Sequence, residues 1–152
     1  SQGAIMSYEV GLRHPETLRG IAALSGSVLP VLKAELKPDA RLGKLAIFIG
    51  HGTLDQALPY YSATRANEVL MGIGLKPEFH GYPGMIHTVG EAELLDLKNW
   101  LENSLRKKGG GWLACDSGVS VAKNSDWSIA IAGKPAPTLD FHCQVNRVIY
   151  RR

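Results

Sequence analysis

The chain has 152 residues, of which 45% are hydrophobic and 20% charged, close to the balance of an ordinary globular protein. This length allows about one domain, and the composition excludes wholesale disorder and fibrous architectures. The 17 Lys and Arg and 14 Asp and Glu give a net charge of +3, which is spread along the sequence rather than gathered in a basic stripe. Because a dedicated nucleic-acid binder needs clustered cations, we expect no nucleic-acid partner.

The sequence also argues against a membrane span, a disulfide framework and a metal site. The longest apolar runs, such as residues 45–49, are far shorter than the ~18 residues that cross a bilayer. Cys115 and Cys143 lack C-x-x-C spacing and are most simply reduced thiols, and His142 beside Cys143 is a poor metal pair. We expect no metal and a cytoplasmic location, although the chain begins with Ser1 rather than Met and its start carries no targeting information.

The first half of the chain alternates between helical and strand patterns. Apolar residues at helical spacing predict a helix over 4–12, and the apolar run 20–24 predicts a buried strand followed by a turn. Residues 29–43 are expected to be mostly loop, with one short helix near 31–36. Residues 45–49 are apolar at every position, which is typical of a parallel strand covered on both faces.

The alternation continues with a helix after Pro59, a strand over 77–82 and a long helix over about 91–107. Trp100 widens the apolar stripe of that last helix, which is made by Leu94, Leu97, Leu101 and Leu105. Helix, strand, loop, strand, helix, strand, helix is the order of a parallel α/β layer. We therefore expect an α/β fold of about three parallel strands with flanking helices.

At Gly109-Gly110-Gly111 the character of the sequence changes. Little amphipathic periodicity follows, and residues 119–122, 128–132 and 143–150 are candidate short strands. A run of glycines is typical of a flexible joint. We therefore divide the chain into an α/β unit at residues 1–108 and a glycine-joined tail of unknown fold at residues 109–152.

Three polar sequences lie at helix starts or directly after strands: Ser1-Gln2-Gly3, His51-Gly52-Thr53-Leu54-Asp55 and Tyr82-Pro83-Gly84-Met85-Ile86-His87. The carboxyl ends of parallel strands meet at one edge of a sheet, so we expect these sequences to converge. A serine nucleophile needs an imidazole to take its proton, and the imidazole needs a carboxylate to fix its tautomer. The chain order Ser, Asp, His is that of the α/β-hydrolases.

In these three sequences the chain resembles the second half of the phospholipase/carboxylesterase family, which includes the acyl-protein thioesterases. The resemblance covers about residues 1–108. It implies the C-terminal half of an α/β-hydrolase that cleaves small carboxylic esters or thioesters through an acyl-serine intermediate. It also implies that no metal and no organic cofactor takes part.

Carried over residue by residue, the resemblance assigns three side chains and one backbone group. Ser1 would be the nucleophile, His87 the general base and acid, and Asp55 the carboxylate that orients His87. The backbone N–H of Gln2 would be one donor of the oxyanion hole, since in this fold the residue after the nucleophile supplies it.

The chain departs from the family pattern before Ser1. The strand that leads into the nucleophile and the loop with the second oxyanion donor have no counterpart in this sequence. We therefore expect a sheet with an open apolar edge that favours self-association. We interpret the chain as the C-terminal part of a hydrolase, and its activity on its own stays open.

Other interpretations stay open as well. The chain could be a non-catalytic α/β fragment or interaction module, or an enzyme whose N-terminal serine uses its own amine as base. Taken singly, Ser1 is also a plain helix N-cap, Asp55 a turn residue and His87 a solvated loop histidine. His51 is interpreted as shaping its turn.

Overall fold

The computed structural model describes residues 1–106 and 129–132. Their elements are α1 (Gln2–Arg13), β1 (Gly20–Leu24), α2 (Pro30–Glu35), the short 3₁₀ helix η1 (Leu42–Lys44), β2 (Ala46–Gly52), α3 (Tyr61–Gly72), β3 (Glu78–Tyr82), α4 (Glu91–Arg106) and β4 (Ile129–Ala132). The helix and strand order predicted up to residue 106 is confirmed, and so is a strand near 128–132. The candidate strands at 119–122 and 143–150, like His142 and both cysteines, lie outside the described residues.

The strands form one sheet in the order β3-β2-β1-β4, and every neighbouring pair is parallel. All five residues of β1 are buried, as expected of a strand covered on both faces. β2 runs three residues beyond the apolar run that predicted it, because its pairing with β3 continues to the Gly52–Tyr82 register. The polar His51 is therefore part of a central strand rather than of the loop after it.

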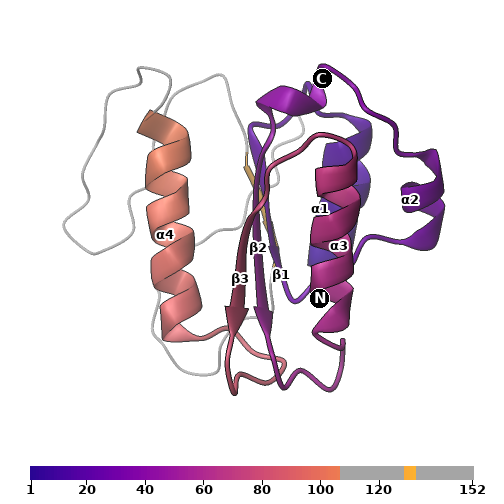
Figure 1. Cartoon of the computed structure of the whole chain (residues 1–152). Helices are drawn as coiled ribbons and strands as arrows, with labels where there is room; N and C mark the ends of the chain where they lie inside the picture. The colour runs from indigo at the N-terminus through magenta and orange to yellow at the C-terminus, as the bar shows by residue number, and fades with distance from the viewer. Residues whose placement is uncertain (107–128, 133–152) are drawn as a thin grey trace.

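Helices cover both faces of the sheet (Figure 1): α1 and α3 lie on one face, α4 on the other, and α2 lies outside the first layer. Successive residues of a strand point alternately to the two faces of the sheet, and each face has its own core. One core is made by Ala4, Tyr8, Leu12, Ile21, Ala23, Ile47, Ile49, Ala63, Ala66 and Leu70, together with Leu32 of α2, Leu42 of η1, Leu45 and Leu75. The opposite core is smaller and is made by Ala22, Leu24, Phe48, Leu97 and Trp100.

Helix α4 buries a different stripe from the one that the leucine spacing predicted. Leu97 and Trp100 are buried as expected, but Leu94 is only partly buried and Glu93 is 0% exposed. The first turn of α4 thus turns a carboxyl, rather than a leucine, toward the sheet. Leu105 lies beyond the side chains that the structure describes.

Strand β4 pairs with β1 along the edge that the sequence analysis expected to be open. It comes from the region assigned to the tail, and its four residues align with Gly20 to Ala23 of β1. A fourth parallel strand therefore joins the three that were predicted, and β1 becomes an interior strand. Among the residues described, no helix is both long and apolar enough to cross a bilayer.

Candidate active site

Hydrogen bonds join the loops that follow β2 and β3. The Thr53 N–H donates to the carbonyl of Tyr82 and the Leu54 N–H to that of Met85, each with an N···O distance of 3.0 Å. The Gly84 N–H donates to Thr53 Oγ1, also at an N···O distance of 3.0 Å. Gly52 allows this contact, because a Cβ at that position would overlap the Met85 carbonyl. The end of β2 and the loop after β3 therefore form one unit.

In this unit of two loops, the side chain of His87 contacts that of Asp55. The ring Nδ1 of His87 lies 2.6 Å from Asp55 Oδ2, the distance of a charge-assisted hydrogen bond. Two of the three residues assigned as catalytic, from different loops, are thus in direct contact. The Asp55 side chain is 0% exposed and that of His87 17% exposed, so solvent reaches the pair only at His87.

The surroundings of Asp55 keep its carboxyl ionised. Its Oδ1 accepts hydrogen bonds from two backbone N–H groups, that of Ala57 at an N···O distance of 2.9 Å and that of Leu58 at 2.8 Å. Burial acts to raise the pKa of Asp55, but the Leu58 N–H and the His87 ring outweigh it and hold that pKa below its ordinary value. An ionised carboxylate can only accept, so the proton between the two groups belongs to Nδ1 of His87. Its Nε2 is then left as the basic nitrogen.

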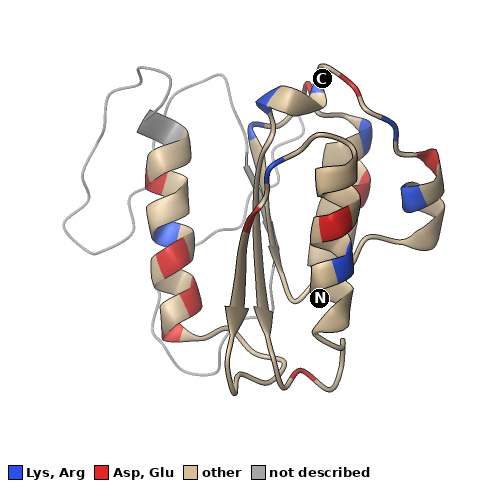
Figure 2. Cartoon of the chain, viewed as in Figure 1, with Lys and Arg blue, Asp and Glu red and all other residues tan. Residues whose placement is uncertain are grey.

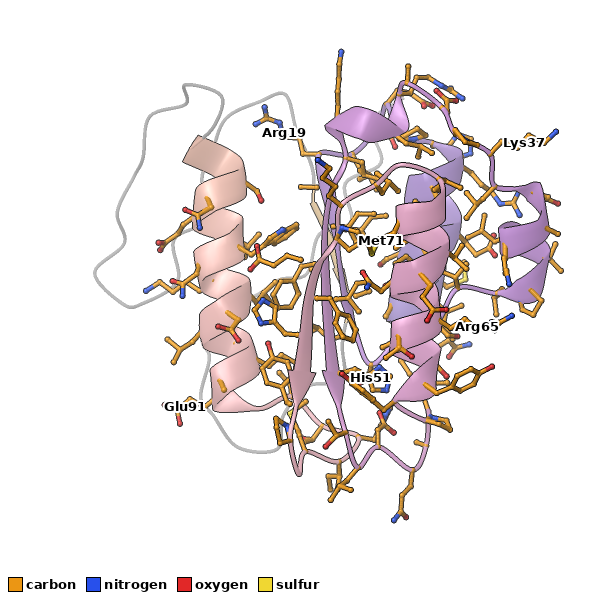
Figure 3. The ribbon with its side chains drawn as sticks, viewed as in Figure 1. Arg19, Lys37, His51, Arg65, Met71 and Glu91 are labelled. Carbon is orange, nitrogen blue, oxygen red and sulfur yellow. The ribbon has the colours of Figure 1, made fainter. Side chains whose placement is uncertain are left out.

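A second histidine, which the sequence analysis took only as a turn residue, lies against the same carboxylate. His51 Nε2 lies 2.8 Å from the Leu58 carbonyl oxygen and 3.3 Å from Asp55 Oδ2. Figure 3 shows His51 near the end of β2, on the side of the sheet that α3 covers. A histidine four residues before the candidate acid was the signal available in the sequence.

Ser1 and Gln2 begin α1. The N terminus lies toward the same end of the sheet as the carboxyl ends of the strands (Figure 1). Ser1 occupies the N-cap position, but its hydroxyl makes no capping hydrogen bond. The N–H of Gln2, as the first residue of the helix, has no partner within α1. No hydrogen bond between Ser1 and His87 occurs in the structure of residues 1–106.

Little formal charge surrounds the His87–Asp55 pair. Between Gly50 and Tyr60, Asp55 is the one residue among Asp, Glu, Lys and Arg, and residues 83–90 contain none of these four types. Figure 2 accordingly shows most of the Lys, Arg, Asp and Glu positions on the helices and toward the other end of the sheet. Within the described part of the chain, no group of three or more His, Cys, Asp or Glu side chains could hold a metal ion.

Residues 1–105 match the family model described as phospholipase/carboxylesterase. The chain belongs to this family. The match includes Ser1, Asp55 and His87. The four-stranded parallel sheet with its flanking helices is accordingly part of an α/β-hydrolase fold.

Curated relatives carry esterase and thioesterase names. Over 109 residues the chain is 37% identical to an acyl-protein thioesterase 1 of Neurospora crassa, covering 70% of this chain and 44% of the relative. Over the same length it is 32% identical to a probable carboxylesterase of Oryza sativa, covering 40% of it. The crystal structure of SOBER1 from Arabidopsis thaliana superposes with a TM-score of 0.61 at 30% identity, covering 69% of this chain and 50% of that one. The chain spans about half the length of these relatives.

Proposed function

We propose that the chain carries the catalytic residues of a serine hydrolase that cleaves carboxylic esters or thioesters. Ser1 is the nucleophile, His87 the general base and acid, and Asp55 the carboxylate that orients His87. The observation that carries the proposal is the 2.6 Å contact between His87 Nδ1 and Asp55 Oδ2, because it leaves Nε2 of His87 free to take a proton.

The chemistry follows from the roles of these groups. Nε2 of His87 takes the hydroxyl proton of Ser1 while Oγ attacks the acyl carbonyl carbon. The N–H of Gln2 donates to the oxyanion that forms, an interaction commonly worth ~3–4 kcal/mol in the transition state. His87 then gives its proton to the departing alcohol or thiol, which leaves an acyl-serine. A water molecule, deprotonated by the same nitrogen, releases the acid and restores Ser1.

Three features support this assignment. The family match includes all three residues, the relatives are named as carboxylesterases and acyl-protein thioesterases, and the loops of Asp55 and His87 are hydrogen-bonded into one unit. The unused hydroxyl of Ser1 is compatible with a nucleophile and speaks against a plain N-cap. The division of the chain at the triple glycine remains part of the proposal: residues 1–108 hold the catalytic groups, and residues 109–152 are a glycine-joined tail whose strand β4 completes the sheet.

The test is covalent labelling with a fluorophosphonate probe, followed by mass spectrometry of the labelled peptide. We expect one adduct on Ser1, its loss in Ser1→Ala, and its strong reduction in His87→Ala. Ser7→Ala is the matched control, since it removes a hydroxyl of the same helix that is bonded to the Gly3 carbonyl instead. Hydrolysis of a short-chain p-nitrophenyl ester and of an acyl thioester then compares the two substrate classes.

Two results would contradict the proposal. Labelling that survives Ser1→Ala would remove Ser1 from the mechanism. A folded chain with no labelling at all would favour the non-catalytic α/β fragment or interaction module. Acetylation of the α-amine separates the remaining alternative, because an N-terminal serine that uses its own amine as base would lose all reactivity.

A further inference from the structure

His51 is buried within the candidate site, and the mechanism above does not use it. Its side chain is 0% exposed, at the end of β2 and four residues before Asp55. The ring stands edge-on to that of Tyr60, with centroids 6.1 Å apart. A polar ring in so closed a position needs a partner for its nitrogen atoms.

The partners of His51 fix its tautomer. A backbone carbonyl can only accept, so the 2.8 Å contact with the Leu58 oxygen requires a proton on Nε2. The other nitrogen, Nδ1, is buried and has no hydrogen-bond partner among the described residues. A second proton there would be an unpaired buried donor, so the ring is the uncharged Nε2–H form.

That single N–H holds the chain around Asp55. Leu58 donates its own N–H to Asp55 Oδ1 and accepts the His51 N–H at its carbonyl. The segment that wraps one carboxylate oxygen is thereby tied to the end of β2. The same N–H lies 3.3 Å from Asp55 Oδ2, the oxygen that binds His87.

Oδ2 of Asp55 is thus enclosed by two imidazoles. Nδ1 of His87 supplies the short bond at 2.6 Å, and Nε2 of His51 lies beside it on a second side. Besides these rings, the groups facing the carboxylate are the N–H groups of Ala57 and Leu58. Because the Asp55 side chain is 0% exposed, the direction in which Oδ2 points depends on these two rings and two N–H groups.

We propose that His51 is a positioning residue, whose Nε2–H holds the Asp55 carboxylate in the orientation that fixes the tautomer of His87. This proposal rests on the proposed function for its catalytic meaning, but its structural claim can be measured in the inactive protein. Without this N–H, the Leu58 carbonyl loses its buried partner, and the segment that donates to Asp55 Oδ1 loses its tie to β2, so the carboxylate is held less firmly. His87 is then no longer held as the Nδ1–H form.

The test uses NMR of the imidazole nitrogens and protons in the full chain, which needs no turnover. In the wild type we expect His87 as the Nδ1–H tautomer, with a downfield proton that persists until Asp55 is protonated. In His51→Phe, which keeps a ring against Tyr60, we expect mixed tautomers of His87 and loss of that proton at a higher pH than in the wild type. His80→Phe is the control, because His80 stacks on Phe48, which belongs to the core that α4 covers.

Two variants with smaller side chains, His51→Gln and His51→Asn, test the same proposal if His51→Phe does not fold. The amide nitrogen of His51→Gln can reach the position of Nε2, whereas that of His51→Asn reaches only the position of Nδ1. We expect Gln to retain the wild-type tautomer and pH midpoint, and Asn to lose both. An unchanged His87 signal in His51→Phe, or equal signals in Gln and Asn, would overturn the proposal.

Labelling distinguishes this proposal from the proposed function. If the chain is active, we expect fluorophosphonate labelling to slow about 10- to 100-fold in His51→Phe, the scale of a misplaced catalytic group, and less than about threefold in His51→Gln. Absent labelling in the wild type with the expected NMR pattern would defeat the function and leave the positioning role intact.

Discussion

At the scale of single residues, the most unusual group outside the site is the carboxyl of Glu93. It lies in the first turn of α4 and faces β2 at Gly50, where a Cβ would overlap one of its oxygens. Neither oxygen makes a hydrogen bond within the described part of the chain. Burial raises the pKa of Glu93 to about 7, against a smaller opposing effect of the nearby Gly90 N–H.

This shift predicts a particular pH dependence of stability. The folded chain holds the Glu93 proton more tightly than the unfolded chain, whose carboxyl has a pKa of about 4.3. The contribution of Glu93 to the free energy of unfolding is therefore largest below that value and falls as the pH rises to about 7, by on the order of 3 kcal/mol. Urea unfolding of the wild type and Glu93→Gln from pH 4 to pH 8 should show the wild type losing stability relative to the variant.

Glu91→Gln is the matched control for this measurement. Glu91 also lies in the first turn of α4, but its side chain is exposed and points away from the sheet (Figure 3). We expect its stability curve to run parallel to that of the wild type. A Glu93→Gln curve parallel to the wild type would mean that folding does not shift the pKa of Glu93.

At the scale of elements, the site depends on how closely β2 approaches the loop after β3. Gly52→Ala places a methyl group against the Met85 carbonyl and forces the two loops apart. We expect a loss of about 1–3 kcal/mol in urea unfolding, the range for overpacking a close contact. Since the displaced loop carries His87, fluorophosphonate labelling should slow by at least about tenfold.

Gly72→Ala serves as the control substitution for this prediction. A Cβ at Gly72, the last residue of α3, meets nothing within 4 Å. Alanine should there be neutral or stabilise the helix by up to ~1 kcal/mol, with labelling unchanged. If Gly52→Ala behaved in the same way, the close approach of the two loops would not matter for the site.

These elements also show what the sequence could predict and what it could not. The continuous apolar runs of β1 and β2 identify buried parallel strands, and the motifs after β2 and β3 predict that Asp55 and His87 converge, as they do. The burial of Glu93 could not be predicted, because an acidic residue in a first turn normally favours solvent and the helix dipole. The positioning role proposed for His51 depends on the Leu58 carbonyl oxygen, and no residue pattern predicts the direction of a backbone atom.

At the scale of the whole molecule, the edge of the sheet at β1 is covered by β4, a strand from beyond the triple glycine. An unpaired β1 would present five buried residues and a row of free backbone groups, which invites pairing with another chain. The pairing with β4 replaces that edge with a strand of four residues. Very short edge strands are poor templates for association, so we infer that β4 protects the monomer.

Two truncated chains that differ only in β4 test this inference. Residues 1–132 keep β4, residues 1–128 lack it, and both lack residues 133–152. By light scattering over a range of concentrations, we expect the longer chain to stay monomeric and the shorter one to gain mass as concentration rises. The shorter chain should also unfold at lower urea, because β1 loses the strand that pairs with it. Equal masses and equal midpoints would show that the pairing with β4 contributes nothing, and self-association would then have to involve another surface.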